Sequence, residues 1–352
     1  MAHSVASVPA PDQSYSGEGG PSDTTAQLRR EAQRHTYAAV DLGTNNCRLL
    51  IARPDDKGFT VIDAFSRVVR LGEGLSLSGE LSQDAMDRAV AALAICADKL
   101  RRRNVSIARS VATEACRRAR NGARFADRVR DETGIVLDII PPQEEARLAV
   151  LGCHKLLEPG DGPALIFDIG GGSTELVLID HVDGIPKIRS WWSAPWGVVS
   201  LTESEGKEAL EGDERLSAYK RMRQRARSAF ANFAAILPEE RQGIRLLGTS
   251  GTVTTLASIH LALPSYDRKA VDGLHVPIED MRAISEMIAN MTYAERCALP
   301  CIGAERADLV VAGCAILEAI IEIWPAANLG VADRGIREGI LRSMMARDGW
   351  QL

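Results

Sequence analysis

The sequence predicts an α/β protein made of two copies of one unit, and three observations support this prediction. Predicted strands alternate with predicted helices along most of the chain, which is typical of α/β domains. A strand, a glycine turn and a second strand occupy Tyr37–Ile51, and the same pattern returns 127 residues later within Ala164–Asp180. The chain has 352 residues, and at roughly 100–200 residues per domain this length accommodates two domains.

The ends of these domains follow from changes in composition. Residues 1–36 are rich in Ser, Pro, Gly and Gln without an apolar period, which predicts a disordered tail. This segment also lacks the basic and apolar regions of a signal peptide. Domain I is expected over residues 37–155 and domain II over residues 156–352, with the last helix packing back on domain I.

The elements of domain I follow from the spacing of apolar residues. Ser82 is a candidate N-cap for a helix whose apolar residues recur at helical spacing. The expected order is a strand pair within Tyr37–Ile51, a strand over Gly58–Val69, a helix over Ser82–Arg103, a strand over Ile107–Ala112, a helix over Ala115–Thr133, a strand over Ile135–Ile140 and a helix over Glu144–Cys153.

Domain II repeats this alternation after its own glycine hairpin. Pro325 is expected to end one helix, because proline lacks the backbone N–H that a helix interior needs. The expected elements are a helix over Asp213–Ala235, a strand over Ile244–Leu247, a turn over Gly248–Thr252, and helices over Val253–Leu263, Glu279–Met291, Glu305–Trp324 and Arg334–Arg347.

The composition is that of an ordinary globular protein, with 45% hydrophobic and 25% charged residues. No apolar run approaches the roughly 18 residues that span a bilayer, so no membrane partner is expected. Seven scattered cysteines without a CxxC pair predict reduced thiols in a cytoplasmic protein, and the six histidines lack zinc-site spacing. No nucleic-acid partner is expected, because no binding motif occurs and few aromatic residues interleave with the basic ones.

Basic residues are concentrated in two segments, although the formal net charge is −5. Lys99–Arg130 holds eleven basic residues and only two acidic ones, Glu114 and Asp127. The second basic segment is Lys220–Arg227. Such runs are often solvated helix faces, but two of them in a net-acidic chain favour an anionic ligand.

The glycine hairpin within Asp168–Glu175 is the sharpest functional signal. Its three consecutive glycines leave backbone N–H groups open to the oxygens of an anion. A strand follows instead of a helix, which argues against a dinucleotide fingerprint, and no GxxxxGK[ST] motif occurs. The earlier hairpin repeats this pattern from Asp41 to Gly43, with Arg48 at the position of Glu175. One hairpin alone is compatible with a simple tight turn, but two of them predict loops that clamp one phosphate-bearing ligand.

A third glycine turn, Gly248–Gly251, precedes a helix, where free amides and the helix dipole favour phosphate. Its alternative role is that of a connector in which Ser250 or Thr252 caps the helix. Asp168 and Glu175 are typical oxygen ligands for Mg²⁺. Their alternative roles are an Asx turn and a solvent-facing strand residue.

Seven short segments occur in an order that is more specific than any one of them. They are Asp41–Arg48, Ala112–Arg117, Glu144–Arg147, Asp168–Glu175, Gly248–Thr252, Glu305–Asp308 and Asp333–Ile340. From about Tyr37 to Met345 the chain thereby resembles the exopolyphosphatase/guanosine pentaphosphate phosphatase family of the actin-like ATPase-fold superfamily. The resemblance implies two actin-like, ribonuclease H-like domains flanking a cleft, in the short form that lacks extra C-terminal helical domains.

The resemblance also implies a hydrolase that uses Mg²⁺ to split a terminal phosphoryl group from polyphosphate or a guanosine polyphosphate. Glu145 matches the family's general base, and its alternative role is that of a first-turn acid complementing the helix dipole. Arg48, Arg117 and Arg306 match arginines that face the phosphate chain, Arg48 and Arg306 as catalytic groups. The expected phosphate-binding residues are Arg117, Gly43, Thr44, Asn45, Asn46, Gly170, Gly171, Gly172, Ser173, Thr174, Ser250 and Gly251, and the expected metal ligands are Asp41, Asp168 and Glu175.

Three features of the sequence differ from the family pattern. Pro141-Pro142 stands where small residues often precede the glutamate pair, and it stiffens the approach to Glu145. Thr44 replaces the usual serine of the first loop and keeps its hydroxyl. The aromatic segment Trp191–Trp196 is expected to pack under domain II, with stacking on a guanine as the alternative.

Inorganic polyphosphate is the first expected substrate, because the basic segments suit an extended polyanion. Guanosine pentaphosphate is the alternative within the family. Two further alternatives are a sugar or acetate kinase, which shares the fold, and a non-catalytic sensor that binds polyphosphate or (p)ppGpp. A homodimer is expected only because it is the commonest oligomer.

Overall fold

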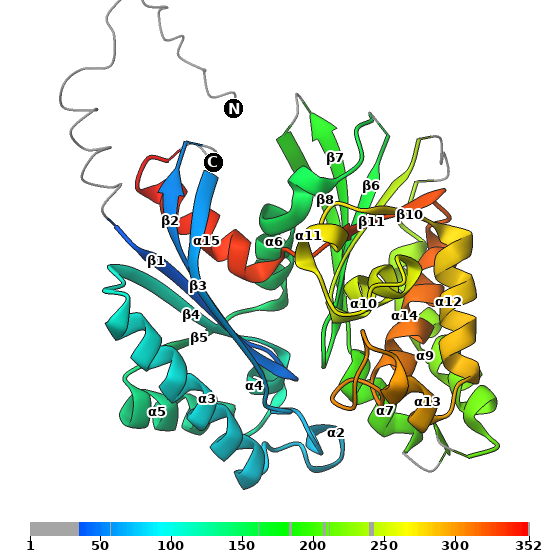
Figure 1. The fold of residues 1–352 in the computed structure, drawn as a ribbon, viewed down its shortest axis with the longest axis horizontal. Coiled ribbons are helices and arrows are strands. Elements are labelled where there is room, and N and C mark those ends of the chain that lie inside the picture. The colour runs from blue at the N-terminus through cyan, green and yellow to red at the C-terminus, as the bar shows by residue number, and fades with distance from the viewer. Residues whose placement is uncertain are drawn as a thin grey trace, which may run out of the picture.

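The computed structural model describes residues 35–56, 58–160, 162–182, 185–206, 209–210, 212–238 and 243–350. The predicted tail, residues 1–36, lies outside these ranges except for its last two residues. Figure 1 shows two α/β domains, each with a central sheet that has helices on both faces.

Each domain is organised around one sheet. The strand order is β3-β2-β1-β4-β5 in the first sheet and β10-β11-β9-β6-β7-β8 in the second. The strands are β1 (Tyr37–Leu42), β2 (Asn46–Asp55), β3 (Gly58–Val68), β4 (Ile107–Ala112), β5 (Leu137–Ile139), β6 (Ala164–Ile169), β7 (Thr174–Val182), β8 (Ile185–Ala194), β9 (Arg245–Thr249), β10 (His275–Pro277) and β11 (Asn328–Ala332).

The internal repeat that the sequence predicts is confirmed by the order and direction of the strands. β1 runs antiparallel to β2 and parallel to β4, and β6 runs antiparallel to β7 and parallel to β9 in the same way. Asp41 lies opposite Arg48 in the first hairpin, and Asp168 lies opposite Glu175 in the second. The repeat therefore places an arginine and a glutamate at equivalent positions of the two domains.

Helices cover the outer faces of both sheets and fill the space between them (Figure 1). Helices α3 and α5 pack on the outer face of the first sheet, and α9, α10, α12 and α14 pack on the outer face of the second. The helices are α2 (Leu75–Ser78), α3 (Gln83–Arg102), α4 (Glu114–Arg118), α5 (Gly122–Thr133), α6 (Pro142–Cys153), α7 (Val198–Glu205), α9 (Arg215–Ala234), α10 (Gly251–His260), α11 (Arg268–Val271), α12 (Ile278–Asn290), α13 (Tyr293–Ala298), α14 (Val310–Ile323) and α15 (Ile336–Arg347), with a 3₁₀ turn at His154–Leu156.

The helix pair α6 and α15 lies between the two sheets and joins the domains. Helix α15 comes from the end of the chain but packs on the first sheet, where Ile340 shares a buried core with Tyr37. Helix α6 contributes to that core and also packs on the second sheet. The helices cross so closely that a Cβ at Gly152 would lie 2.0 Å from the Gly335 carbonyl oxygen, so only glycine fits there.

The helix expected over Ala115–Thr133 is wrong as a single element, because the structure has two helices, α4 and α5, in its place. The chain turns at residues 119–121, where the Asn121 side chain bonds the backbone N–H and carbonyl of Leu81 at 2.9 and 3.0 Å. A Cβ at Gly122 would lie 2.0 Å from the Cys116 carbonyl oxygen, so this glycine permits the sharp turn.

The helix expected over Glu305–Trp324 begins only at Val310. The residues before it form turns, and one of them, Asp308, pairs with Arg70 of the first domain at 3.2 Å. The turns thus place Asp308 in contact with the first domain.

Strand β8 is absent from the sequence prediction and carries part of the aromatic segment Trp191–Trp196. The Trp192 indole N–H donates to the Ala229 carbonyl of α9 at 3.1 Å. Arg225 lies over the Trp196 ring at 5.9 Å. The segment therefore packs against the helices of the second domain, as the first of its two predicted roles requires.

All seven cysteines are free thiols and five of them are buried, as predicted. The Sγ atoms of Cys47 and Cys96 face each other at 3.9 Å. Within the described residues, no helix has both the length and the apolar character needed to cross a membrane.

Candidate active site

A cleft lies between the domains at the turns that follow β1 and β6. Its walls are formed by both glycine hairpins, the starts of α4, α6 and α10, and the segment before α14, and it encloses an empty volume of about 970 Å³ open to solvent. The predicted site residues that line it are Asp41, Gly43, Thr44, Asn45, Asn46, Arg48, Glu145, Asp168, Gly170, Gly171, Gly172, Ser173, Glu175, Ser250, Gly251 and Arg306. The fold thus brings residues from both halves of the sequence to one place.

The two glycine hairpins meet across this cleft. Each turn is closed by the same hydrogen bond, from the Gly43 amide to the Asn46 carbonyl at 2.9 Å and from the Gly170 amide to the Ser173 carbonyl at 3.0 Å. A Cβ at Gly171 would lie 2.9 Å from the Cβ of Thr44 in the opposite loop, closer than real side chains approach. The absence of a side chain at Gly171 therefore lets the two loops approach each other this closely.

Glu145 reaches the cleft from the first turns of α6. This helix begins at Pro142, and proline suits the first helical position because its fixed φ matches the helix and its missing N–H is not needed there. The Pro141-Pro142 pair therefore initiates α6 instead of disturbing it. Glu145 is 6% exposed, and its carboxylate accepts two hydrogen bonds of 3.1 Å from the guanidinium of Arg117.

Arg117 lies behind Glu145 and is not one of the residues that line the cleft. Its guanidinium donates to the Ile140 carbonyl at 2.6 Å and to the Glu114 carboxylate at 2.7 Å, in addition to Glu145. Two carboxylates and one carbonyl thus occupy the donors that the sequence analysis assigned to phosphate. In this arrangement Arg117 fixes the position of Glu145.

Five carboxyl groups line the cleft, and burial raises the pKa of four of them: Asp41, Glu145, Asp168 and Glu175. The pKa of Asp168 is raised to about 8, first by the loss of water and then by the charge of Glu175. Burial also raises the pKa of Glu145 well above its usual value, and the charge of Glu175 raises it further, while Arg117 opposes the shift. The cleft therefore concentrates negative charge in a place with little water.

These carboxylates fit a divalent cation. The hydroxyls of Ser173 and Ser193 donate to Glu175 at 2.7 and 2.9 Å and orient it. The buried Oδ1 of Asp41 has no hydrogen-bond partner among the described residues, and a cation would offset the crowded charge. The described residues include no group of three or more His, Cys, Asp or Glu side chains arranged to hold a metal alone. Mg²⁺ often takes one or two carboxylates and completes its shell with water and substrate phosphate, and Asp168 and Glu175 are the pair that would hold it here.

Arg48 and Arg306 line the cleft with few protein partners. Arg306 makes one hydrogen bond, of 3.4 Å, to the Thr255 hydroxyl, and the Arg48 guanidinium makes no hydrogen bond or ion pair within the described ranges. Both guanidinium groups are therefore open to phosphate oxygens. The predicted phosphate ligand Thr174 is fully buried instead, and its hydroxyl donates to the Trp196 carbonyl at 2.7 Å. It supports the second loop from behind.

The start of α10 forms another wall of the cleft. The Ser250 hydroxyl accepts a hydrogen bond from the Val253 amide at 3.2 Å, so Ser250 is the N-cap of this helix, one of the two roles considered for it. The position next to it, Gly251, lies beside Arg306, with a Cβ there only 3.9 Å from the Arg306 Nη1. A helix start and a guanidinium thus face the same space.

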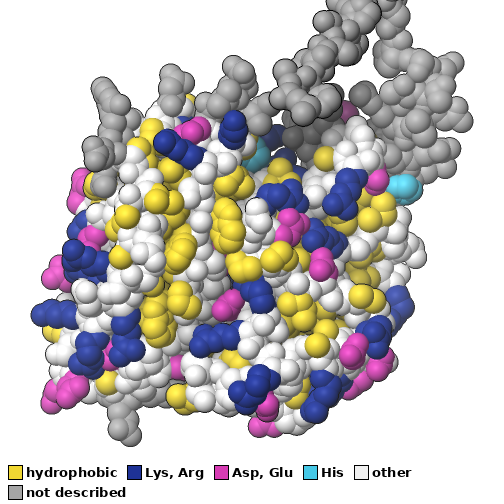
Figure 2. All heavy atoms as spheres, turned by 180° about the vertical axis from the view of Figure 1, so that it is seen from behind, with side chains coloured by type: hydrophobic (Ala, Val, Ile, Leu, Met, Phe, Trp, Pro, Cys, Tyr) yellow, Lys and Arg dark blue, Asp and Glu magenta, His cyan; other side chains and the backbone are white. Residues whose placement is uncertain are grey.

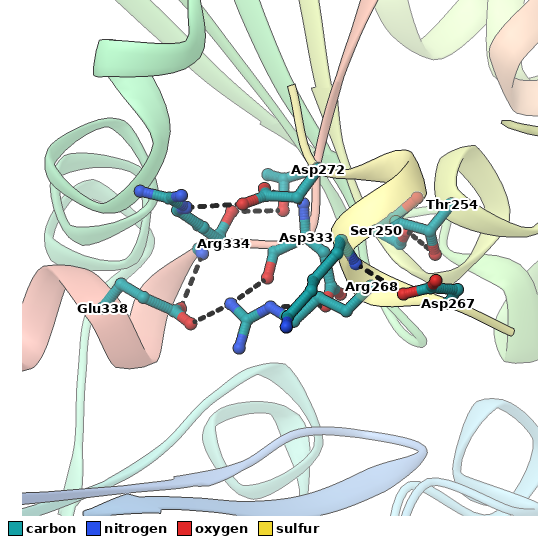
Figure 3. A network of polar contacts seen from close by, with 11 residues as sticks. Ser250, Thr254, Asp267, Arg268, Asp272, Asp333, Arg334 and Glu338 are labelled. Carbon is teal, nitrogen blue, oxygen red and sulfur yellow. Dashed lines mark hydrogen bonds and ion pairs between the residues drawn. The ribbon is translucent and has the colours of Figure 1, made fainter. Parts of the chain in front are cut away.

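A network of ion pairs holds the segment between β11 and α15 next to this helix start (Figure 3). Arg268 of α11 pairs with Asp333 at 3.0 Å and with Glu338 at 2.9 Å. Arg334 pairs with Asp272 at 2.7 Å. These contacts fix the chain at the point where it returns from the second domain to α15.

Acidic side chains lie beside most basic residues of Lys99–Arg130 and Lys220–Arg227, so these segments offer less free charge to an anionic ligand than their composition indicates. Acidic neighbours pair with most of their side chains: Lys99, Arg101, Arg103, Arg109, Arg117, Arg120, Arg128 and Arg130 in the first segment, and Arg221, Arg223, Arg225 and Arg227 in the second. The face in Figure 2 shows Lys and Arg side chains interspersed with Asp and Glu. The open arginines of the cleft are a separate set.

Two residues near the cleft were missed by sequence reasoning. Glu114 lines the cleft and pairs with Arg117, and the three-residue spacing of this pair on a helix was the available signal. Arg337 borders an adjoining cavity. It belongs to the Asp333–Ile340 segment, which contributed to the resemblance without an assigned role.

The fold and the site define a class of protein: a two-domain α/β enzyme in which two glycine loops and a buried carboxylate face one cleft. Residues 50–348 match the model of the Ppx/GppA phosphatase family. The chain therefore belongs to the Ppx/GppA phosphatase family, whose members act as hydrolases, and the resemblance found in the sequence is confirmed.

Similar proteins extend this assignment along most of the chain. The chain is 30% identical over 328 residues to Exopolyphosphatase 2 of Mycobacterium tuberculosis, a match covering 87% of this chain and 98% of the relative. It is 29% identical to the guanosine-5'-triphosphate,3'-diphosphate pyrophosphatase of Photobacterium profundum, covering 88% of this chain and 59% of that relative. The solved structure of the Aquifex aeolicus family member aligns with a TM-score of 0.72 at 29% identity, covering 90% of this chain and 99% of that one. The structural match confirms that the two α/β domains have the fold of a solved Ppx/GppA family member.

Proposed function

We propose that this protein hydrolyses the terminal phosphoanhydride of inorganic polyphosphate with Mg²⁺ and releases orthophosphate. The observation that carries the proposal is the single cleft in which two glycine loops face the buried carboxylate of Glu145. The relative from Mycobacterium tuberculosis, which this chain matches over almost its whole length, is named an exopolyphosphatase, and this supports a polyphosphate substrate.

In the proposed reaction, the glycine loops hold the terminal phosphoryl group, and Arg48 and Arg306 bind oxygens along the phosphate chain. Glu145 orients a water molecule and accepts its proton as the new P–O bond forms. The bridging P–O bond breaks, and its electron pair remains on the oxygen of the departing chain. The products are orthophosphate and a chain one unit shorter. The raised pKa of Glu145 makes it a stronger base than an exposed glutamate, and Arg117 fixes its orientation.

Asp168 and Glu175 are the proposed metal ligands, with Asp41 beside them. Mg²⁺ bound there would neutralise charge on the phosphate oxygens. The Ser173 and Ser193 hydroxyls keep the Glu175 carboxylate oriented for this role.

Guanosine pentaphosphate is the second candidate substrate, and one observation favours it. Acidic neighbours pair with most basic side chains of Lys99–Arg130 and Lys220–Arg227. These two segments therefore no longer favour a long polyanion over a nucleotide. The relative from Photobacterium profundum is named for a guanosine polyphosphate. Both substrates end in a phosphoanhydride, so both would use the same cleft residues.

Phosphate release from the purified protein tests the proposal, with long polyphosphate and guanosine pentaphosphate compared in Mg²⁺ and in EDTA. Metal-dependent release from polyphosphate, faster than from guanosine pentaphosphate, is the expected result. Glu145→Gln is expected to lose at least about 100-fold in turnover while it keeps polyphosphate affinity. Glu144→Gln is the matched control, because Glu144 is its neighbour on α6 but pairs with Arg109 and Arg147 outside the cleft.

Each other outcome has a definite meaning. An active Glu145→Gln enzyme would remove Glu145 from the role of base. Faster release from guanosine pentaphosphate would select the second substrate. Binding without release from either substrate would favour the sensor, and phosphate transfer only when an acceptor is added would favour a kinase.

A further inference from the structure

A second cavity adjoins the cleft on the side of α15, and we call it the α15 cavity. Its empty volume is about 980 Å³. It continues along Tyr266 and Asp333 to Arg337, and the residues that it shares with the cleft are Asp41, Arg48, Asp168, Ser250, Gly251, Arg306 and Ile336. Of the residues that line the α15 cavity, the proposed reaction uses only those shared with the cleft. The remainder of the cavity, which includes Asp333 and Arg337, has no role in that reaction.

Arg337 is the side chain in the α15 cavity that most needs a partner. Its guanidinium makes no hydrogen bond or ion pair with any residue of the described ranges. Burial lowers its pKa, and Arg48 lowers it further, while the charges of Glu338, Asp41 and Asp333 act in the opposite direction. The Arg337 side chain is partly exposed to the cavity, and its guanidinium carries five donors that can bind an anion there.

Two helix starts add positive potential to the same space. Helix α15 begins at Ile336, so Arg337 lies in its first turn, and helix α10 begins at Gly251. All three residues border the α15 cavity. A cation in the first turn of a helix opposes the helix dipole, so Arg337 occupies an unfavourable position unless an anion lies beside it.

Two charged side chains of the α15 cavity, Arg334 and Asp333, belong to the network in Figure 3. Arg334 pairs with Asp272 at 2.7 Å, and Asp333 pairs with Arg268 at 3.0 Å. Arg337 and the two arginines of the shared wall are left with donors that no carboxylate accepts. Arg48, Arg306 and Arg337 line one cavity, and each guanidinium can bind two oxygens of a phosphoryl group.

We propose that the α15 cavity is a second anion subsite, in which Arg337 binds the phosphoryl groups on the leaving side of the scissile bond. The terminal phosphoryl group lies between the glycine loops, and the chain runs past Arg48 and Arg306 to Arg337. This direction rests on the proposed function. The occupants with this chemistry are the inner units of inorganic polyphosphate and the phosphates of guanosine pentaphosphate.

Binding measurements on Glu145→Gln protein test the subsite without turnover, so they give an answer even if the wild-type protein hydrolyses neither substrate. Calorimetry would compare pyrophosphate, long polyphosphate and guanosine pentaphosphate before and after adding Arg337→Gln. We expect the Kd for long polyphosphate to rise at least about ten-fold and the Kd for pyrophosphate to change less than about two-fold, because the lost contacts are charge-assisted hydrogen bonds to the inner phosphates. Arg342→Gln is the matched control, since Arg342 lies on the same helix but stacks over Phe59 at 5.6 Å.

Every result of this comparison decides between the alternatives. Weaker binding of polyphosphate alone supports the subsite and assigns it to the inorganic chain. Weaker binding of guanosine pentaphosphate alone supports it and assigns it to the nucleotide. Unchanged affinity for both would overturn the proposal. If Arg337→Gln fails to fold, Arg337→Lys is measured instead, because lysine keeps the positive charge but lacks the planar guanidinium. The Kd of the Arg337→Lys protein for one of the two ligands should then rise by an intermediate factor.

Discussion

Replacing Arg117 with methionine should destabilise the fold far more than replacing Glu145 with glutamine, although the two side chains bond each other. The Arg117 side chain is 19% exposed, and its guanidinium donates hydrogen bonds to the carboxylates of Glu114 and Glu145 and to the Ile140 carbonyl. Its loss leaves two carboxylates and a carbonyl without their donor, and breaking a buried pair in this way costs about 3–5 kcal/mol. Glu145→Gln leaves Arg117 paired with Glu114 and removes a charge that burial already disfavours, so we expect a cost below about 1 kcal/mol.

Urea unfolding followed by circular dichroism would measure both costs, with the slope of each transition checked against the wild-type protein. In the double variant the cost of losing Arg117 should shrink by at least about 1 kcal/mol, because one of the stranded carboxylates is gone. A cost below about 1 kcal/mol for Arg117→Met, or a larger cost for Glu145→Gln than for Arg117→Met, would refute the reasoning.

The same structure makes three further predictions. Gly152→Ala places a Cβ 2.0 Å from the Gly335 carbonyl oxygen and should cost about 1–3 kcal/mol or more in thermal unfolding; an unchanged Tm would show that α6 and α15 can move apart. Because the pKa of Asp168 is raised to about 8, the native state keeps a proton that the unfolded state releases, so stability should fall as pH rises from about 4 to 8 without divalent ions. Asp168→Asn should reduce this slope, and an equal slope in both proteins would contradict the burial argument. The pKa of Glu144 is lowered to about 2, first by its hydrogen bond with Arg147. Its stabilising effect should therefore be present above about pH 4 and disappear as the pH falls through 2. The melting temperatures of Glu144→Gln and wild-type protein should converge at that low pH.

Much of the fold was predictable because its main signals are local. The alternation of strand residues and the glycine turn define both hairpins within Tyr37–Ile51 and Ala164–Asp180, and their repetition predicts two equivalent sheets. The break between α4 and α5 was not predictable in this way. It depends on Asn121 reaching Leu81, which is 40 residues away in the sequence, and local helical spacing carries no trace of that contact.

The candidate site likewise has one part that local sequence predicts and another part that depends on contacts distant in sequence. Short motifs were enough to bring the glycine loops and Glu145 to one cleft, since residues within a hairpin or a helix start stay together. The partners of each arginine depend on elements that fold next to it. Arg117 is occupied by two carboxylates and a carbonyl, and Arg221 and Arg225 share Glu205, so a count of basic residues overstated the charge available to an anion.

The first domain cannot complete its core until the ribosome has added the last helix. Apolar side chains of its sheet, such as Tyr37 and Leu50, are covered by Ile340 and Met345 of α15. The whole second sheet is synthesised between these two parts of one core, so it can fold while the inner face of the first sheet is still open. A nascent chain that stops before residue 336 would present that apolar face to chaperones and to other chains.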